Sequence, residues 1–272
     1  MSAARASRLL AVYAAVACCF SIAPVAVIFV ESLTGADYVS FPPVGLSLKW
    51  YLEIPKRPEF IASLLTSVVV AASAAVVSTG LGATAALALV RYRFPGRAVL
   101  QGLFLSPLSV PGIVLGIALL QFYATYGIPR TGLTLALAHL VITTPYTIRL
   151  VSVSLAGFDQ NLERAARSLG ASSWRTFRLV TLPLIRPGIL AGAVFAFIVS
   201  FDDLAVSLFL SSPGAMTLPV RIFTYIEQIY DPLITAVSSL LILVAVGVVV
   251  LIERTVGMGR LFGAEAPRTA PR

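Results

Sequence analysis

The sequence predicts an all-α membrane protein with six transmembrane helices. Of its 272 residues 58% are hydrophobic and 12% are charged, whereas a soluble domain usually carries about 25% charged residues. The mean hydropathy is +0.93. The chain also contains six long apolar stretches that are almost free of charge. Together these observations indicate a polytopic protein whose apolar surface faces lipid.

The six stretches are expected to span the membrane in order. They cover residues 9–30, 61–90, 98–123, 133–148, 188–201 continuing past an acidic pair to 210, and 233–252. A hydrocarbon core of ~30 Å needs about 20 helical residues. The fourth stretch is the shortest, but it reaches about 18 residues, the lower bound, if Thr131 and Gly132 are included. We therefore expect one transmembrane domain over residues 1–272, with its core at 61–252.

The distribution of basic residues predicts the orientation. Fifteen of the 20 Lys and Arg residues fall on the side that carries both termini. The other side carries Lys49, Lys56, Arg57, Arg130 and Arg221. Cytoplasmic loops are enriched in Lys and Arg, so both termini are expected in the cytoplasm. The positive charge is then a topology signal and predicts no nucleic-acid partner.

Of the three outer stretches, two are expected as longer loops, at residues 31–60 and 211–231. The second shows Leu218, Ile222, Tyr225 and Ile229 at helical spacing, which predicts a short amphipathic helix at the outer surface.

Small residues recur every four positions in the second span. They are Ser67, Ala71 and Ala75, and then Ser78, Gly82 and Ala86. Such spacing lets helices approach closely in lipid. A dimerisation face and a contact inside the chain both fit.

Pro107, Pro111 and Gly112 lie within the third predicted span. Backbone groups that they free from helical hydrogen bonds are tolerated only against protein or a water-filled cavity. A bend that lines a pathway and an ordinary kink both fit.

The longest cytoplasmic segment, residues 149–187, is expected to contain a short helix. Asp159 suits the start of that helix and Gly170 its end. Leu162, Ala165, Ala166 and Leu169 lie on one face at helical spacing. This shallow face suits docking onto another protein, and packing on the inner ends of the chain's own spans is the alternative. A second short helix is expected from Ser173, with Trp174 and Phe177 on one face.

One motif in this segment resembles a known family. Glu163 to Gly170, followed by Val180-Thr-Leu-Pro183, resembles the EAA loop of permeases of binding-protein-dependent ABC importers. Val180 replaces the family's Ile. Arg164 stands where its Glu falls, because Glu163 comes one position early and is turned by about 100° on the helix.

Further segments resemble the spermidine/putrescine, PotC-like branch of this family. These segments are Ser47 to Tyr51, Arg91 to Arg97, Ser200 to Leu204 and Leu218 to Ile222. The resemblance implies a type I importer permease with the MetI-like fold in the bacterial inner membrane. It implies, as partners, a second permease subunit in a heterodimer, a cytoplasmic ABC ATPase dimer and a periplasmic substrate-binding protein.

The resemblance also assigns a role to residues 158–187 as the coupling loop. The residues expected to dock the ATPase are Glu163, Arg164, Ala165, Ala166, Leu169 and Gly170. ATP would be used by the ATPase, and this chain is expected to bind no cofactor. The sequence agrees, because neither of its lysines lies in the Gly-Lys-Ser/Thr context of a phosphate-binding loop. We therefore expect no catalytic residue.

Asp202 and Asp203 are the acids of the fifth span, and carboxylates inside a membrane are costly enough to suggest function. One is expected to face the substrate pathway, where it would attract a polycationic amine. Bonding to backbone or to Arg221 is the alternative. His139 is expected to be packed or hydrogen-bonded. Adjacent Cys18 and Cys19 have no ligand company, so no metal site is expected.

The sequence also bears on other substrates and other classes of membrane protein. Related permeases carry opines, aminoalkylphosphonates or ferric ions, and these substrates remain alternatives for this chain. A secondary transporter usually shows paired repeats, and no matching halves are evident. An intramembrane aspartyl protease would need carboxylates from two helices, whereas Asp202 and Asp203 are neighbours.

Overall fold

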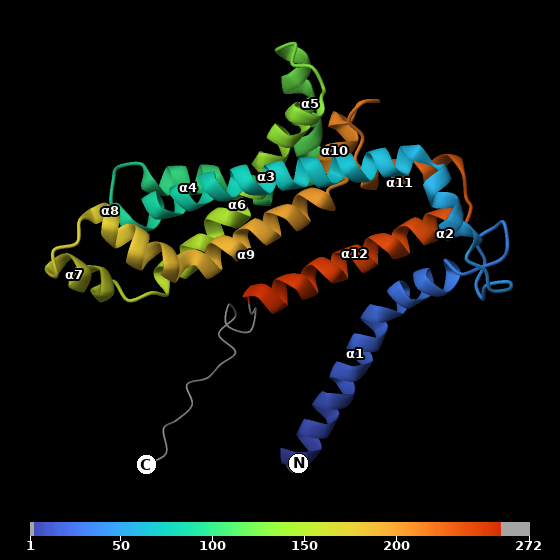
Figure 1. The fold of residues 1–272 in the computed structure, drawn as a ribbon, viewed down its shortest axis with the longest axis horizontal. Coiled ribbons are helices and arrows are strands. Elements are labelled where there is room, and N and C mark those ends of the chain that lie inside the picture. The colour runs from blue at the N-terminus through green and yellow to red at the C-terminus, as the bar shows by residue number, and fades with distance from the viewer. Residues whose placement is uncertain (1–2, 257–272) are drawn as a thin grey trace. The chain divides into compact units, whose positions relative to one another are not determined.

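The computed structural model describes residues 3–256, which are almost entirely helical (Figure 1). Within that range the only β pairing is two isolated bridges. The elements are α1 (Ala3–Glu31), α2 (Lys49–Glu53), η1 (Ile54–Lys56), α3 (Pro58–Arg91), α4 (Arg97–Leu105), η2 (Ser106–Ser109), α5 (Gly112–Thr125), α6 (Gly132–Ala156), α7 (Asn161–Ser168), α8 (Ser173–Thr176), η3 (Phe177–Thr181), α9 (Leu182–Phe201), α10 (Ala205–Leu210), α11 (Leu218–Gln228) and α12 (Leu233–Val256).

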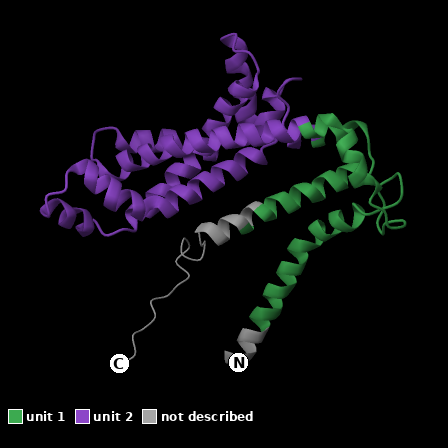
Figure 2. Cartoon of the chain, viewed as in Figure 1, with its two compact units in different colours: residues 1–61, 222–251 green, residues 62–221, 252–272 purple. Residues whose placement is uncertain are grey.

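The chain divides into two compact units, coloured in Figure 2. The first comprises residues 1–61 and 222–251, and the second 62–221 and 252–272. The expected single domain over 1–272 stays a prediction. In the first unit, the Tyr51 hydroxyl lies 2.6 Å from Ser32 Oγ and 2.7 Å from Ser239 Oγ, which links the outer loop to α12. Cys18 and Cys19 are exposed on α1, so neither is packed within the described chain.

The amphipathic helix expected near residue 218 is present as α11. Tyr225 on this helix is buried, packs edge-on against Phe60 at 5.3 Å between ring centroids, and donates a hydrogen bond to Asp231. Burial, together with that hydrogen bond, raises the pKa of Tyr225 to about 12.

The second unit is built on α3, α6 and α9. Figure 1 shows α6 and α9 side by side, and they share the most extensive helix contact. The Thr147 hydroxyl on α6 donates to the Ser78 carbonyl of α3 at 2.8 Å. The small residues of α3 are all buried here: Ser67, Ala71, Ala75, Ser78, Gly82 and Ala86. They form a contact inside the chain, and of the two alternatives, a dimerisation face and an internal contact, the structure supports the second.

Gly82 permits this close approach, and replacing it is expected to destabilise the permease. A Cβ at position 82 would collide with the Thr147 hydroxyl and lie 3.0 Å from the Ile148 nitrogen. Overpacking of this kind costs about 1–3 kcal/mol. Gly82→Ala should therefore lower the thermal midpoint of the purified permease. Gly80→Ala on the exposed side of α3, with nothing within 4 Å, is the matched control and should not lower it. Equal midpoints for the two variants would contradict the contact.

The third predicted span is not continuous, which corrects the expectation of one helix over 98–123. Its two halves, Arg97–Ser109 and Gly112–Thr125, meet at 109°. Pro107 lies in η2 and Pro111 immediately precedes α5, where their missing N–H groups cost no helical bond. With 14 residues, α5 is about 21 Å long and cannot cross the membrane alone.

The bent half is held by glycine contacts with α10. A Cβ at Gly112 would lie 2.9 Å from the Ala205 Cβ, and one at Gly116 would lie 2.8 Å from the Phe209 ring. Only a glycine face allows α5 and α10 to pack this closely. Pro107, Pro111 and Gly112 therefore lie at a 109° bend of the chain.

Four helices are long and apolar enough to cross a membrane, namely Leu9–Glu31, Pro58–Arg91, Gly132–Ala156 and Ser173–Phe201, with the bent pair as a fifth candidate. The described apolar part of the last helix, Leu233–Gly247, is shorter. The number six therefore stays a prediction. The fifth span differs from expectation at both ends. It is continuous from Ser173 through a π-helical turn at η3, and it ends at Phe201.

Candidate translocation and coupling sites

The acidic pair lies in a break between two helices, which corrects the expected continuous helix. α9 ends at Phe201, and α10 begins at Ala205. The segment 202–204 between them is not helical. The two aspartates therefore owe their different environments to this break.

Asp203 accepts hydrogen bonds from the backbone at the start of α10. Its Oδ2 lies 3.1 Å from the Val206 nitrogen and 2.8 Å from the Ser207 nitrogen. A carboxylate in this position satisfies N–H groups that a helix start leaves unpaired. Bonding to backbone, one of the sequence alternatives, thus applies to Asp203.

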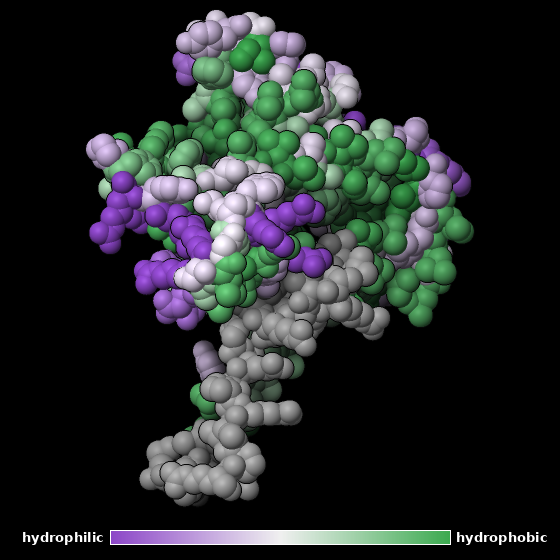
Figure 3. Space-filling model, turned by 60° about the vertical axis from the view of Figure 1, so that its left-hand side comes forward, coloured by the Kyte–Doolittle hydropathy of each residue, from purple (hydrophilic) through white to green (hydrophobic). Residues whose placement is uncertain are grey.

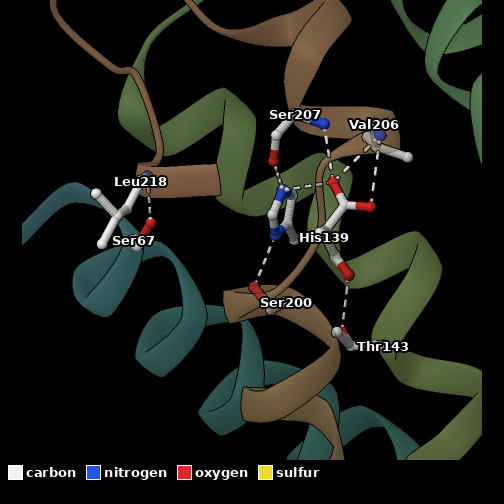
Figure 4. A network of polar contacts seen from close by, with 8 residues as sticks. Ser67, His139, Thr143, Ser200, Val206, Ser207 and Leu218 are labelled. Atoms are coloured by element: carbon white, nitrogen blue, oxygen red, sulfur yellow. Dashed lines mark hydrogen bonds and ion pairs between the residues drawn. The ribbon is translucent and has the colours of Figure 1, made fainter. Parts of the chain in front are cut away.

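His139 joins α6 to both sides of the same break (Figure 4). It is fully buried, with Nδ1 2.6 Å from Ser200 Oγ and Nε2 3.0 Å from Ser207 Oγ. Its Nε2 also lies 3.8 Å from Asp203 Oδ2. The expectation of a hydrogen-bonded histidine is confirmed. The sequence analysis did not predict roles for Ser200 and Ser207. Their positions on either side of the two intramembrane aspartates could have indicated them as hydrogen-bond partners.

Asp202 remains available to a ligand. Its side chain is exposed, and it makes no hydrogen bond or ion pair to any residue in the described range. A carboxylate in an otherwise apolar span attracts cations strongly where the surroundings have a low dielectric constant. Of the two predicted pathway residues, Asp203 is engaged by backbone N–H groups, whereas Asp202 has no hydrogen-bond or ion-pair partner among the described residues.

The coupling loop contains the expected helix, α7, with most of its predicted docking residues outward. Leu162, Arg164, Ala165, Leu169 and Gly170 are exposed, and we call these five residues the docking face. Leu169 is 90% exposed and adds an apolar side chain to this face. Four of the five were predicted as docking residues, and Leu162 was not; the other two predicted residues, Glu163 and Ala166, are both half-buried.

The ends of α7 agree with the sequence in part. Gly170 has φ +86° and ends the helix, as expected, because glycine adopts this left-handed conformation without strain. The start differs slightly. The N-cap residue is Gln160, whose side chain makes no capping hydrogen bond. Asp159, one residue earlier, accepts a hydrogen bond through Oδ1 from the Asn161 nitrogen at 2.9 Å.

Glu163 differs from the docking face because it points toward the rest of the chain. Its Oε2 and Oε1 lie 2.7 Å from Nη1 and Nη2 of Arg91 at the end of α3. The Thr181 hydroxyl donates to the same carboxylate, and the Arg91 guanidinium lies 4.6 Å from the centroid of the Phe158 ring. Glu163 is therefore held within the chain.

A cavity of about 710 Å³, lined by both charged and aromatic side chains, lies beside this ion pair, between α3, α7 and α8. Arg164, Arg167 and Trp174 line it, and Trp174 stacks on Phe177 at 5.7 Å, which confirms their shared face. Figure 3 shows hydrophilic side chains gathered on the side of the molecule that is turned forward, the side with α7 and α8 in Figure 1. This end of the second unit presents both charge and exposed apolar side chains.

The apolar helices, the broken acidic span and the exposed loop helix define a multi-pass membrane protein. Residues 78–257 match the family of binding-protein-dependent transport system inner membrane components, and the chain belongs to this family. It is 35% identical over 237 residues to the putrescine transport system permease protein PotI of Escherichia coli K12, which covers 85% of this chain and 84% of PotI. It is 32% identical over 225 residues to the spermidine/putrescine permease PotC of Haemophilus influenzae, with 83% and 88% covered.

A solved structure shows the same fold. A bacterial ABC transporter involved in the import of the acidic polysaccharide alginate matches 94% of this chain and 98% of its own, with a TM-score of 0.72 and 16% identity. The chain is therefore a transport permease subunit with the expected fold, and its relatives are not enzymes.

Proposed function

We propose that this chain is one of two permease subunits of an ATP-driven importer for spermidine or putrescine. The observation that carries the substrate class is the exposed carboxylate of Asp202, which has no partner among the described residues, at the break of an apolar span. Similarity to PotI and PotC supports the same class. Polyamines carry several ammonium groups, and a carboxylate without an internal partner can bind one of them.

The motor is a separate ATPase dimer, as the family resemblance implies. The docking face offers that dimer a shallow apolar surface with an arginine, Arg164, at its edge. Docking would be on the cytoplasmic side, with both termini there, because most Lys and Arg residues flank the spans on that side. A periplasmic binding protein would deliver substrate from outside.

A reconstitution tests this proposal. The permease, its genomic neighbour permease, the cognate ATPase and the cognate binding protein are placed in proteoliposomes with ATP. Labelled spermidine, putrescine, an opine, an aminoalkylphosphonate and ferric ion are then offered in turn. We expect ATP-dependent uptake of the polyamines alone. Uptake of one of the other solutes, with the polyamines excluded, would contradict the substrate assignment and leave the importer assignment standing.

A further inference from the structure

We propose that Arg91 and Glu163 are a positioning pair that fastens the docking face to the inner end of α3, so that movement of the ATPase reaches the spans. The proposal rests on the importer function above. The two side chains are 72 positions apart in sequence. They form two parallel hydrogen bonds, each 2.7 Å long, and remain only 16% and 12% exposed.

The geometry of the pair makes it a directional link. A guanidinium that binds a carboxylate through two nitrogens fixes orientation as well as distance. Thr181, in the π-helical turn that leads into α9, donates to the same carboxylate. Glu163 thus joins α7 to α3 and to the turn that precedes α9.

Apart from this ion pair, the helix that carries the docking face contacts the short elements α8 and η3. α7 has eight residues, none of them buried. A helix this short is not stable alone in water. It is bounded by the loop before Gln160 and by Gly170, where the chain turns. Without the ion pair, a movement of the bound ATPase would rotate α7 on its flanking loops and would not be transmitted to α3.

The position of Glu163 in the sequence explains how α7 can both bind Arg91 on its inner side and present the docking face on its outer side. Residues 163 and 164 are separated by about 100° around the helix. Glu163 therefore faces inward, where Arg91 receives it, while Arg164 and Ala165 face outward. Glu163, which comes one position early in the EAA-like motif, thus links α7 to α3 within the chain.

The test compares uptake and ATP hydrolysis in the same proteoliposomes, using whichever solute the unaltered complex carries. Arg91→Gln and Glu163→Gln should each lower the amount of solute imported per ATP by about fivefold or more, the range of ordinary coupling between sites. The exchanged pair, Arg91→Glu with Glu163→Arg, should recover part of that ratio. Arg93→Gln removes an exposed charge two residues away and should leave the ratio unchanged.

A second measurement does not depend on transport. Hydrogen exchange of the purified permease should be faster in residues 161–168 of Glu163→Gln than in the unaltered chain, with exchange in α9 unchanged. If the single variants keep the normal ratio and normal exchange, or if the exchanged pair recovers nothing, the proposal is overturned. If the unaltered complex imports nothing and binds no ATPase, the importer function fails, and the exchange measurement still decides on the ion pair.

Discussion

Replacing Asp202 by Asn is expected to lower polyamine uptake by about tenfold or more, while the complex assembles normally. A hydrogen bond to a charged group contributes about 1.5–3 kcal/mol, and 1.4 kcal/mol corresponds to a factor of ten. Because Asp202 is exposed and bonded to no described residue, the substitution removes charge without disturbing a contact. Initial rates of spermidine and putrescine uptake in the reconstituted complex measure the effect.

Two control variants give this experiment its meaning. Asp37→Asn removes an acid whose side chain is 88% exposed in the outer loop, and it should leave uptake unchanged. Asp203→Ala removes the acceptor for two backbone N–H groups and should lower the thermal midpoint of the permease instead. Normal uptake by Asp202→Asn would exclude Asp202 from the substrate site.

Replacing Gly170 by Val is expected to separate ATP hydrolysis from uptake. Gly170 has φ +86°, a conformation that costs a residue with a side chain roughly 1–2 kcal/mol. Its surroundings are open, so the substitution strains the end of α7 without crowding a neighbour. The docking face should then be displaced, and uptake should fall while the permease remains folded.

Gly45→Val is the matched control for this strain. Gly45 also has a positive φ, +71°, and open space around it, but it lies in the outer loop. It should affect stability comparably and leave the ratio of uptake to ATP hydrolysis unchanged. Normal coupling in Gly170→Val, with the ATPase still bound, would contradict the assignment of α7 as the docking element.

Composition and spacing predicted the helical membrane fold because apolar stretches of sufficient length must enter lipid. They did not predict the breaks. A stretch such as 98–123 is apolar whether it is straight or turns at Pro107 and Pro111, and only the glycine contacts of α5 with α10 decide. Likewise, Asp202 and Asp203 interrupt a span that hydropathy alone reads as continuous.

The candidate site was predicted in residue type more than in arrangement. Gly170 was correctly predicted as the end of the loop helix, because a helix end has a local sequence signal. The partners of His139 and Glu163 lie 61 to 72 positions away, and no local pattern reports such contacts. Consequently the sequence placed Glu163 among docking residues, whereas its carboxylate is bound to Arg91.

The most direct test of this account is photo-crosslinking from position 165 in intact cells. A photoreactive residue at position 165, on the exposed side of α7, should capture the cognate ATPase. The same photoreactive residue at position 46, which is exposed in the outer loop, should not capture it. Failure to capture an ATP-hydrolysing protein from 165, or labelling of residues 162–170 by a reagent confined to the outside of the cell, would contradict it.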